Sequence, residues 1–133
     1  MAHILVVDDE EGITMVIKEM LVRLKYDVLT AKNGKEALEK LKLGPVELLI
    51  TDIVMPDMDG LELIEEVQRT LPKVKIIAIS GGGNKFYPGD YLNRAKELGA
   101  VYCLPKPFML NELAAVVAKA LSSGQPANSN RPD

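Results

Sequence analysis

The hydrophobic positions of the chain alternate between short continuous runs and longer stretches in which apolar residues recur every three or four positions. Continuous runs that contain many β-branched residues are typical of strands covered on both faces of a sheet. The predicted strands are residues 4–7, 26–31, 48–50, 76–79 and 101–104.

The longer stretches have the spacing of amphipathic helices. The predicted helices are residues 13–24, 35–43, 60–71, 89–98 and 110–121. Breakers such as Pro72 and Gly99 follow the helical stretches, and Asp9 and Asn111 are candidates to cap the helices that follow them. Strict alternation of strand and helix predicts an α/β fold of five βα units, with an open parallel sheet and right-handed crossovers.

The length of 133 residues fits one compact domain. We assign residues 1–121 to this domain. Residues 122–133 are almost free of apolar side chains and are expected to be a flexible tail or the start of a linker. Residues 80–89 are rich in glycine and are expected to form a mobile loop.

Composition excludes several classes of protein. The 16 basic and 19 acidic side chains leave a net charge of −3, which argues against direct nucleic-acid binding. One cysteine and one histidine exclude disulfide frameworks and most zinc sites. The sequence has neither a signal peptide nor a stretch of about 20 apolar residues. We therefore expect a cytoplasmic protein that does not insert into membranes.

Polar side chains follow four of the five predicted strands. Asp8 and Asp9 follow the first strand, Asp52 the third, Ser80 the fourth and Lys106 the fifth. Ligands of open α/β sheets bind beyond the carboxyl ends of the strands. Three carboxylates, a hydroxyl and an ammonium are therefore expected to meet at one edge of the sheet.

Carboxylates that meet in this way need a cation, because each like-charged pair at about 4 Å costs roughly 1–4 kcal/mol. A ligand set of oxygen atoms favours Mg²⁺, with Mn²⁺ as the alternative ion. A metal beside Asp52 would screen an incoming phosphoryl group from the carboxylate that attacks it. Lys106 and Ser80 would then bind other phosphoryl oxygens.

Four segments carry a specific resemblance. They are Leu-Val-Val-Asp-Asp-Glu at 5–10, Leu-Ile-Thr-Asp-Ile-Val-Met-Pro-Asp-Met-Asp-Gly at 49–60, Ile-Ala-Ile-Ser-Gly at 77–81 and Leu-Pro-Lys-Pro-Phe at 104–108. In this order, over about residues 2–121, the chain resembles the receiver domain of two-component response regulators. The resemblance implies a flavodoxin-like sheet with strand order 2-1-3-4-5.

The resemblance also implies a phosphorylation-dependent signalling switch. Asp52 would accept a phosphoryl group from a sensor histidine kinase or a histidine phosphotransfer protein. Asp9, Asp52 and the backbone carbonyl of Val54 would bind Mg²⁺, with Asp8 acting through water. Such a domain catalyses only its own phosphorylation and dephosphorylation.

The remaining implied roles concern phosphoryl binding and output. Lys106 and Ser80 would contact the phosphoryl group, Gly81 would leave space beside it, and the peptide bond before Pro107 would be cis. Movement of Ser80 and Tyr102 would alter the face made by the fourth helix, the fifth strand and the fifth helix. This face would act on a downstream protein or on an output domain in a longer chain, and the resemblance also allows a dimer that forms on phosphorylation.

Other interpretations of the same residues remain open at this point. Asp8 and Asp9 have the alternative role of capping the first helix, and Glu10 and Glu11 are expected on its solvated first turn. A Mg²⁺-dependent phosphohydrolase with an aspartate nucleophile is an alternative function, although such an enzyme usually carries a second aspartate where this chain has Val54. A flavin carrier would need a phosphate loop where this chain has four consecutive acids.

Overall fold

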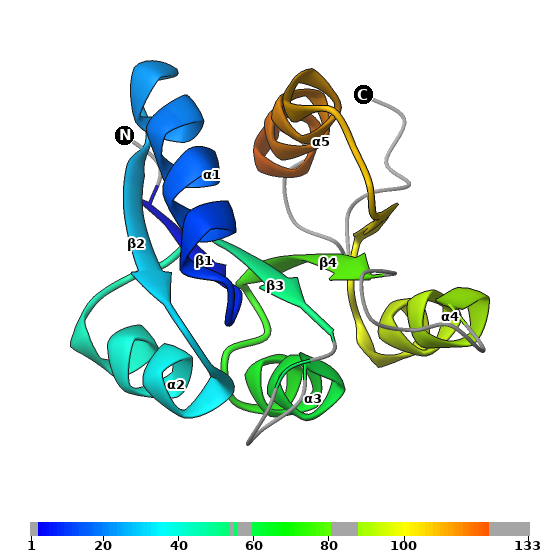
Figure 1. Cartoon of the computed structure of the whole chain (residues 1–133). Helices are drawn as coiled ribbons and strands as arrows, with labels where there is room; N and C mark the ends of the chain where they lie inside the picture. The colour runs from blue at the N-terminus through cyan, green and yellow to red at the C-terminus, as the bar shows by residue number, and fades with distance from the viewer. Residues whose placement is uncertain (1–2, 54, 56–59, 81–87, 123–133) are drawn as a thin grey trace.

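Five strands and five helices alternate along the described part of the chain, as the hydrophobic pattern predicts (Figure 1). The computed structural model describes residues 3–53, 55, 60–80 and 88–122, with the side chains of residues 80 and 88–92 excepted. In chain order the elements are β1 (His3–Val7), α1 (Glu11–Arg23), β2 (Asp27–Ala31), α2 (Gly34–Leu43), β3 (Leu48–Asp52), α3 (Gly60–Thr70), β4 (Lys75–Ser80), α4 (Pro88–Leu98), β5 (Tyr102–Pro105) and α5 (Leu110–Ser122).

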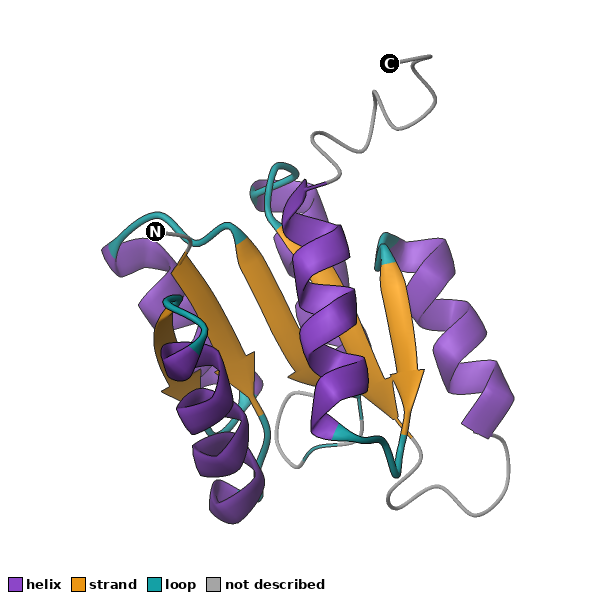
Figure 2. Ribbon diagram, turned by 90° about the horizontal axis from the view of Figure 1, so that it is seen from above, coloured by secondary structure: helices purple, strands orange, loops and turns teal. Residues whose placement is uncertain are grey.

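The strands form one parallel sheet in the order β2-β1-β3-β4-β5, which confirms the predicted fold. In the register of the central pairs, Val7 of β1 lies beside Thr51 of β3, and Asp52 of β3 lies beside Ile79 of β4. The carboxyl ends of β1, β3 and β4 are therefore aligned at one edge of the sheet. All arrowheads point to this edge in Figure 2.

Helices cover both faces of the sheet, with α1 and α5 on one face and α2, α3 and α4 on the other (Figure 1). Side chains of a strand point alternately to the two faces. Ile4 and Val6 accordingly pack in the cluster of α1 and α5, whereas Leu5 and Val7 pack in the cluster of α2, α3 and α4. This double burial explains why the strands appear in the sequence as continuous apolar runs rather than as an alternating pattern.

Several predicted element ends differ from the structure. The second strand begins at Asp27 rather than Tyr26, because the Tyr26 N–H donates to the Leu21 carbonyl and so belongs to the turn after α1. Neither predicted cap was correct. Glu10 occupies the N-cap of α1 and makes no capping bond within the described chain, and Asn111 lies inside α5. Instead, the Glu112 carboxylate accepts a hydrogen bond from the Met109 N–H before α5.

The helices run antiparallel to the strands, so each helix ends at the edge where the strands begin (Figure 2). A buried side chain marks this edge. Lys75, the first residue of β4, is 9% exposed, and its Nζ donates to the Ala120 carbonyl in the last turn of α5 at 2.7 Å. A cation near the last carbonyls of a helix is favourable, because those groups lack partners within the helix.

Candidate functional site

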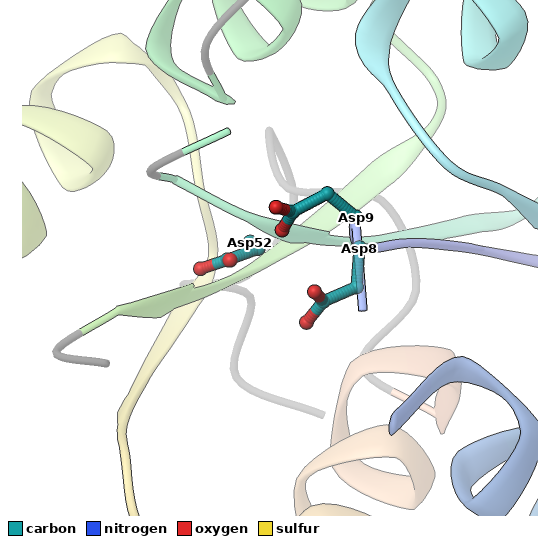
Figure 3. A group of neighbouring side chains, drawn as sticks. All are labelled: Asp8, Asp9 and Asp52. Atoms are coloured by element: carbon teal, nitrogen blue, oxygen red, sulfur yellow. The ribbon is translucent and has the colours of Figure 1, made fainter. Parts of the chain in front are cut away.

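The fold brings three aspartates together at the carboxyl ends of β1 and β3. Asp52 is the last residue of β3, and Asp8 and Asp9 directly follow β1, the neighbouring strand. Each aspartate offers a carboxylate oxygen, and these three atoms lie within 4.8 Å of one another (Figure 3). The predicted meeting of these three side chains is therefore present in the structure.

Burial sets the electrostatics of this cluster. Asp8 is 3% exposed and Asp52 is 6% exposed, whereas Asp9 is exposed to solvent. Loss of solvation, followed by repulsion from Asp8, raises the pKa of Asp52 from 3.8 to about 6. Burial also raises the pKa of Asp8. The ionised form of both carboxylates is thus destabilised in the folded protein. Binding of a cation beside them would relieve this cost.

Lys106 supplies one positive charge to the cluster from the segment that follows β5. Its Nζ lies 3.4 Å from Asp8 Oδ2 and 3.5 Å from Asp52 Oδ2, and its side chain is 13% exposed. Burial alone would lower the pKa of Lys106. Attraction to Asp52 and Asp8 outweighs burial, so this pKa lies above its usual value. Lys106 therefore carries a positive charge across the whole neutral range.

Asp8 has a second role at the start of α1. Its Oδ1 accepts a hydrogen bond from the Glu10 N–H at 2.9 Å, while its Oδ2 faces Lys106. This contact holds the turn before α1 and is not a cap of the helix, whose N-cap is Glu10, so the predicted capping role of Asp8 is wrong while its place in the site is present. Asp9 does not cap the helix, and its carboxylate is part of the cluster (Figure 3).

The structure describes the other predicted site residues only in part. Ser80 ends β4, and its backbone is paired with Pro105; its side chain lies outside the described residues, as do Val54 and Gly81. Tyr102 on β5 is partly buried against the cluster of α1 and α5. The peptide bond between Lys106 and Pro107 is cis, as the resemblance implied.

Gly60, the first residue of α3, approaches the backbone of the site closely. Its N–H donates to the Ile53 carbonyl at 2.6 Å. A Cβ atom at this position would lie 2.2 Å from the Asp52 carbonyl oxygen and 2.5 Å from the Ile53 Cα. The backbone at the start of α3 is therefore in close contact with the peptide group between Asp52 and Ile53.

Two residues near the site were not identified from the sequence. Gly60 gave one usable signal, a glycine at the start of a helix that follows a strand with a site residue at its end. Glu10 was expected on a solvated turn, and its side chain is indeed 65% exposed, but its Oε1 lies 3.9 Å from Lys106 Nζ. No local pattern reports a contact between residues that are almost a hundred positions apart.

No helix in the described ranges combines the length and the apolar character needed to span a membrane. The aspartate cluster with Lys106 and the alternating βα fold are the features to compare with other proteins.

Among curated proteins, the chain is similar to the DNA-binding transcriptional regulator NtrC of Azospirillum brasilense. The two are 39% identical over 94% of this chain and 25% of that relative. The chain thus spans about a quarter of the length of the NtrC proteins that it matches.

Solved structures agree with this similarity. A response regulator receiver domain protein from Clostridium thermocellum has a TM-score of 0.81 and 30% identity, over 91% of this chain and 94% of that one. The response regulator TrrA of Thermotoga maritima, solved in complex with Mg²⁺ and BeF, has a TM-score of 0.77 and 37% identity, over 90% and 99% of the two chains. The family model described as "Response regulator receiver domain" matches residues 4–118. The chain therefore belongs to the response regulator receiver domain family.

Proposed function

We propose that this domain is a signalling switch that accepts a phosphoryl group on Asp52 from a sensor histidine kinase or a histidine phosphotransfer protein. One observation carries the proposal. The Asp52 carboxylate lies at the carboxyl edge of the sheet, 3.5 Å from the Lys106 ammonium and within 4.8 Å of oxygen atoms of Asp8 and Asp9. A carboxylate placed in this way has the neighbours that an anionic phosphoryl group needs.

The transfer needs only the phosphoryl donor and solvent water. An Asp52 Oδ atom attacks phosphorus, and a P–O bond forms while the P–N bond to the donor histidine breaks. The electron pair of that bond stays on the imidazole nitrogen. The ring leaves as neutral imidazole, and takes one proton from solvent where its other nitrogen carried none. With acetyl phosphate as the donor, a P–O bond breaks instead and acetate leaves.

Each residue of the site has a distinct part in this reaction. Asp52 must be ionised to attack, and a pKa of about 6 leaves most of it ionised at pH 7. Lys106 forms a charge-assisted contact with a phosphoryl oxygen. The Ser80 hydroxyl, at the end of β4, is the proposed donor to another oxygen. Asp8 fixes the backbone of Glu10 and so holds the start of α1 against the site.

The donor set fits a hard divalent cation, because three carboxylate oxygens from Asp8, Asp9 and Asp52 lie within reach of one ion. Mg²⁺, or Mn²⁺ in its place, would be held by Asp9, Asp52 and the Val54 carbonyl, with Asp8 acting through water. Bound there, the ion supplies positive charge that shields the phosphoryl group from the surrounding carboxylates. The solved complex of TrrA with Mg²⁺ and BeF supports this assignment.

The output is proposed to leave through the face made by α4, β5 and α5. Tyr102 of β5 is only partly buried, so a change in its packing would alter this face. The NtrC relatives are about four times longer than the matched region, which supports a role as the N-terminal domain of a longer regulator. A stand-alone receiver that binds a downstream protein, and that dimerises on phosphorylation, is the other form of the proposal.

Three further assignments complete the proposal. The domain acts only on its own phosphorylation state and not as an enzyme with a turnover substrate. Its proposed location is the cytoplasm. It is proposed not to contact nucleic acid itself, because a net charge of −3 disfavours binding to phosphate backbones.

The test is covalent labelling by acetyl phosphate in the presence of Mg²⁺, followed by intact-mass measurement. The wild-type protein is expected to gain the mass of one phosphoryl group, and Asp52→Asn is expected to gain none. Asp27→Asn, which removes an exposed carboxylate from the opposite edge of the sheet, is the matched control and is expected to label at the wild-type rate.

Two results would contradict the proposal. Labelling of Asp52→Asn at the wild-type rate would remove Asp52 as the acceptor. Steady release of phosphate from phosphate monoesters would instead favour a phosphohydrolase with an aspartate nucleophile.

A further inference from the structure

The Lys106 ammonium faces a third carboxylate besides Asp8 and Asp52. Glu10 Oε1 lies 3.9 Å from Lys106 Nζ. The backbone of Glu10 is fixed, because its N–H donates to Asp8 Oδ1 at 2.9 Å and its carbonyl accepts the first hydrogen bonds of α1. Its side chain, however, is 65% exposed. Glu10 is thus anchored beside the site with a carboxylate that is free to leave it.

This arrangement separates Glu10 from the two aspartates. Asp8 and Asp52 are almost fully buried and have little room to move away from Lys106. Glu10 reaches water by rotating its side chain, so it loses little when its contact with the ammonium breaks. Of the three carboxylates around Lys106, Glu10 is therefore the one that a new anion displaces most easily.

We propose that Glu10 is a positioning residue that holds the Lys106 ammonium before phosphorylation and releases it when a phosphoryl group arrives. The inference rests on the proposed function, since it assumes that the phosphoryl group is bound to Asp52 and contacts Lys106. A phosphoryl group and the Glu10 carboxylate are both anions that compete for one cation. Glu10 thus slows phosphorylation, and it does so through its contact with Lys106.

The first measurement compares two substitutions that remove the same charge from the same turn. Glu10→Gln removes the carboxylate near Lys106, and Glu11→Gln removes its neighbour, which has no ion pair with Lys106 in the described structure. The pseudo-first-order rate of labelling by acetyl phosphate is measured with Mg²⁺ at low ionic strength. Glu10→Gln is expected to label about two- to fivefold faster than wild type, the range open to an exposed ion pair, and Glu11→Gln less than about 1.5-fold faster.

The second measurement separates the contact from simple repulsion of the donor. Glu10→Asp keeps the negative charge but shortens the side chain by one methylene, so its carboxylate loses the contact with Lys106. It is expected to label faster than wild type, like Glu10→Gln. The advantage of both variants is expected to shrink at high salt, because salt screens the exposed pair in the wild-type protein.

The outcomes are distinct from those that test the proposed function. If the wild-type protein takes no label, the proposed function and this inference fail together. If the wild-type protein labels but Glu10→Gln matches Glu11→Gln or is slower than wild type, only the inference is overturned. A gain in Glu10→Gln that is absent from Glu10→Asp would also overturn it, because charge alone would then explain the effect.

Discussion

At the scale of single residues, the decisive feature is a carboxylate kept in a buried position where its charge is unfavourable. The folded protein holds a proton on Asp52 more tightly than the unfolded chain, with a pKa of about 6 against 3.8. In metal-free solution, the contribution of Asp52 to stability is therefore fully present below about pH 4 and is lost as the pH rises through about 6. Two pKa units correspond to roughly 3 kcal/mol.

Asp52→Asn tests this linkage, because asparagine resembles the protonated side chain at every pH. In the presence of EDTA, the variant is expected to be about 1–3 kcal/mol more stable than wild type at pH 7.5 and equally stable near pH 4. Urea unfolding at the two pH values measures the difference. Glu39→Gln on α2 removes an exposed carboxylate and is expected to show no such pH-dependent gap. An Asp52→Asn protein that is less stable than wild type at pH 7.5 would contradict the argument.

Gly60 is the second residue-scale feature, because no larger side chain fits between α3 and the end of β3. Gly60→Ala places a methyl group 2.2 Å from the Asp52 carbonyl oxygen and is expected to cost about 1–3 kcal/mol of unfolding free energy. Gly12→Ala in α1 is the control, since a Cβ atom there meets nothing within 4 Å. This control is expected to be neutral or to stabilise the protein by up to about 1 kcal/mol. Equal losses in the two variants would show that the close approach is not the cause.

Residues of the site differed in how well the sequence revealed them. Asp8, Asp9, Asp52 and Lys106 were predictable, because parallel strands carry the residues after their ends to one edge of the sheet. The contact of Glu10 with Lys106 was not predictable. It depends on the packing of α1 against the segment after β5, and periodicity carries no information about such packing.

At the scale of elements, the hydrophobic pattern predicted every strand and helix of the described chain, with errors of one or two residues at their ends. These errors have local causes. Tyr26 has the β propensity of a strand residue, but its N–H is used by the turn that ends α1. The capping contact at the start of α5 was not predicted, because the sequence was searched for Asn or Asp. The contact is made instead by Glu112, inside the helix, whose carboxylate accepts a hydrogen bond from the Met109 N–H.

Lys75 offers a test of how the last turn of α5 is held against the start of β4. Lys75→Met keeps the length of the side chain but removes the donor to the Ala120 carbonyl. The amides of the last turn of α5 are expected to exchange hydrogen about fivefold faster, because a buried hydrogen bond contributes on the order of 1 kcal/mol. Mass-detected hydrogen exchange measures this rate. Lys73→Met, at an exposed position before β4, is expected to leave exchange unchanged, and faster exchange in both variants would point to a general effect of charge.

At the scale of the whole molecule, the described part of the chain contains two apolar clusters, one on each face of a single sheet. Among the described residues, the last buried member of these clusters is Ala120 in α5. The domain was assigned to residues 1–121 from the sequence alone, and this boundary stays a prediction until it is measured.

Truncation tests the boundary. A chain that ends at Ser122 is expected to unfold within about 0.5 kcal/mol of the full chain and to label with acetyl phosphate at the same rate. A chain that ends at Ala118 loses the buried Ala120 and its contact with Lys75, and it is expected to be less stable by more than about 1 kcal/mol. Thermal or urea unfolding distinguishes the two. A marked loss of stability on removing only residues 123–133 would mean that the folded unit extends further.

The antiparallel course of α5 has a consequence for any longer regulator built on this domain. The phosphoryl group would bind at the edge of the sheet where the strands end. The chain leaves α5 at the opposite edge, where Lys75 Nζ donates to the Ala120 carbonyl in the final turn of α5. β4 alone, with six residues, spans about 20 Å between them. A neighbouring module that follows this exit directly starts about 20 Å from the modified aspartate. A shift in how the helices lie on the sheet would carry the change across that distance.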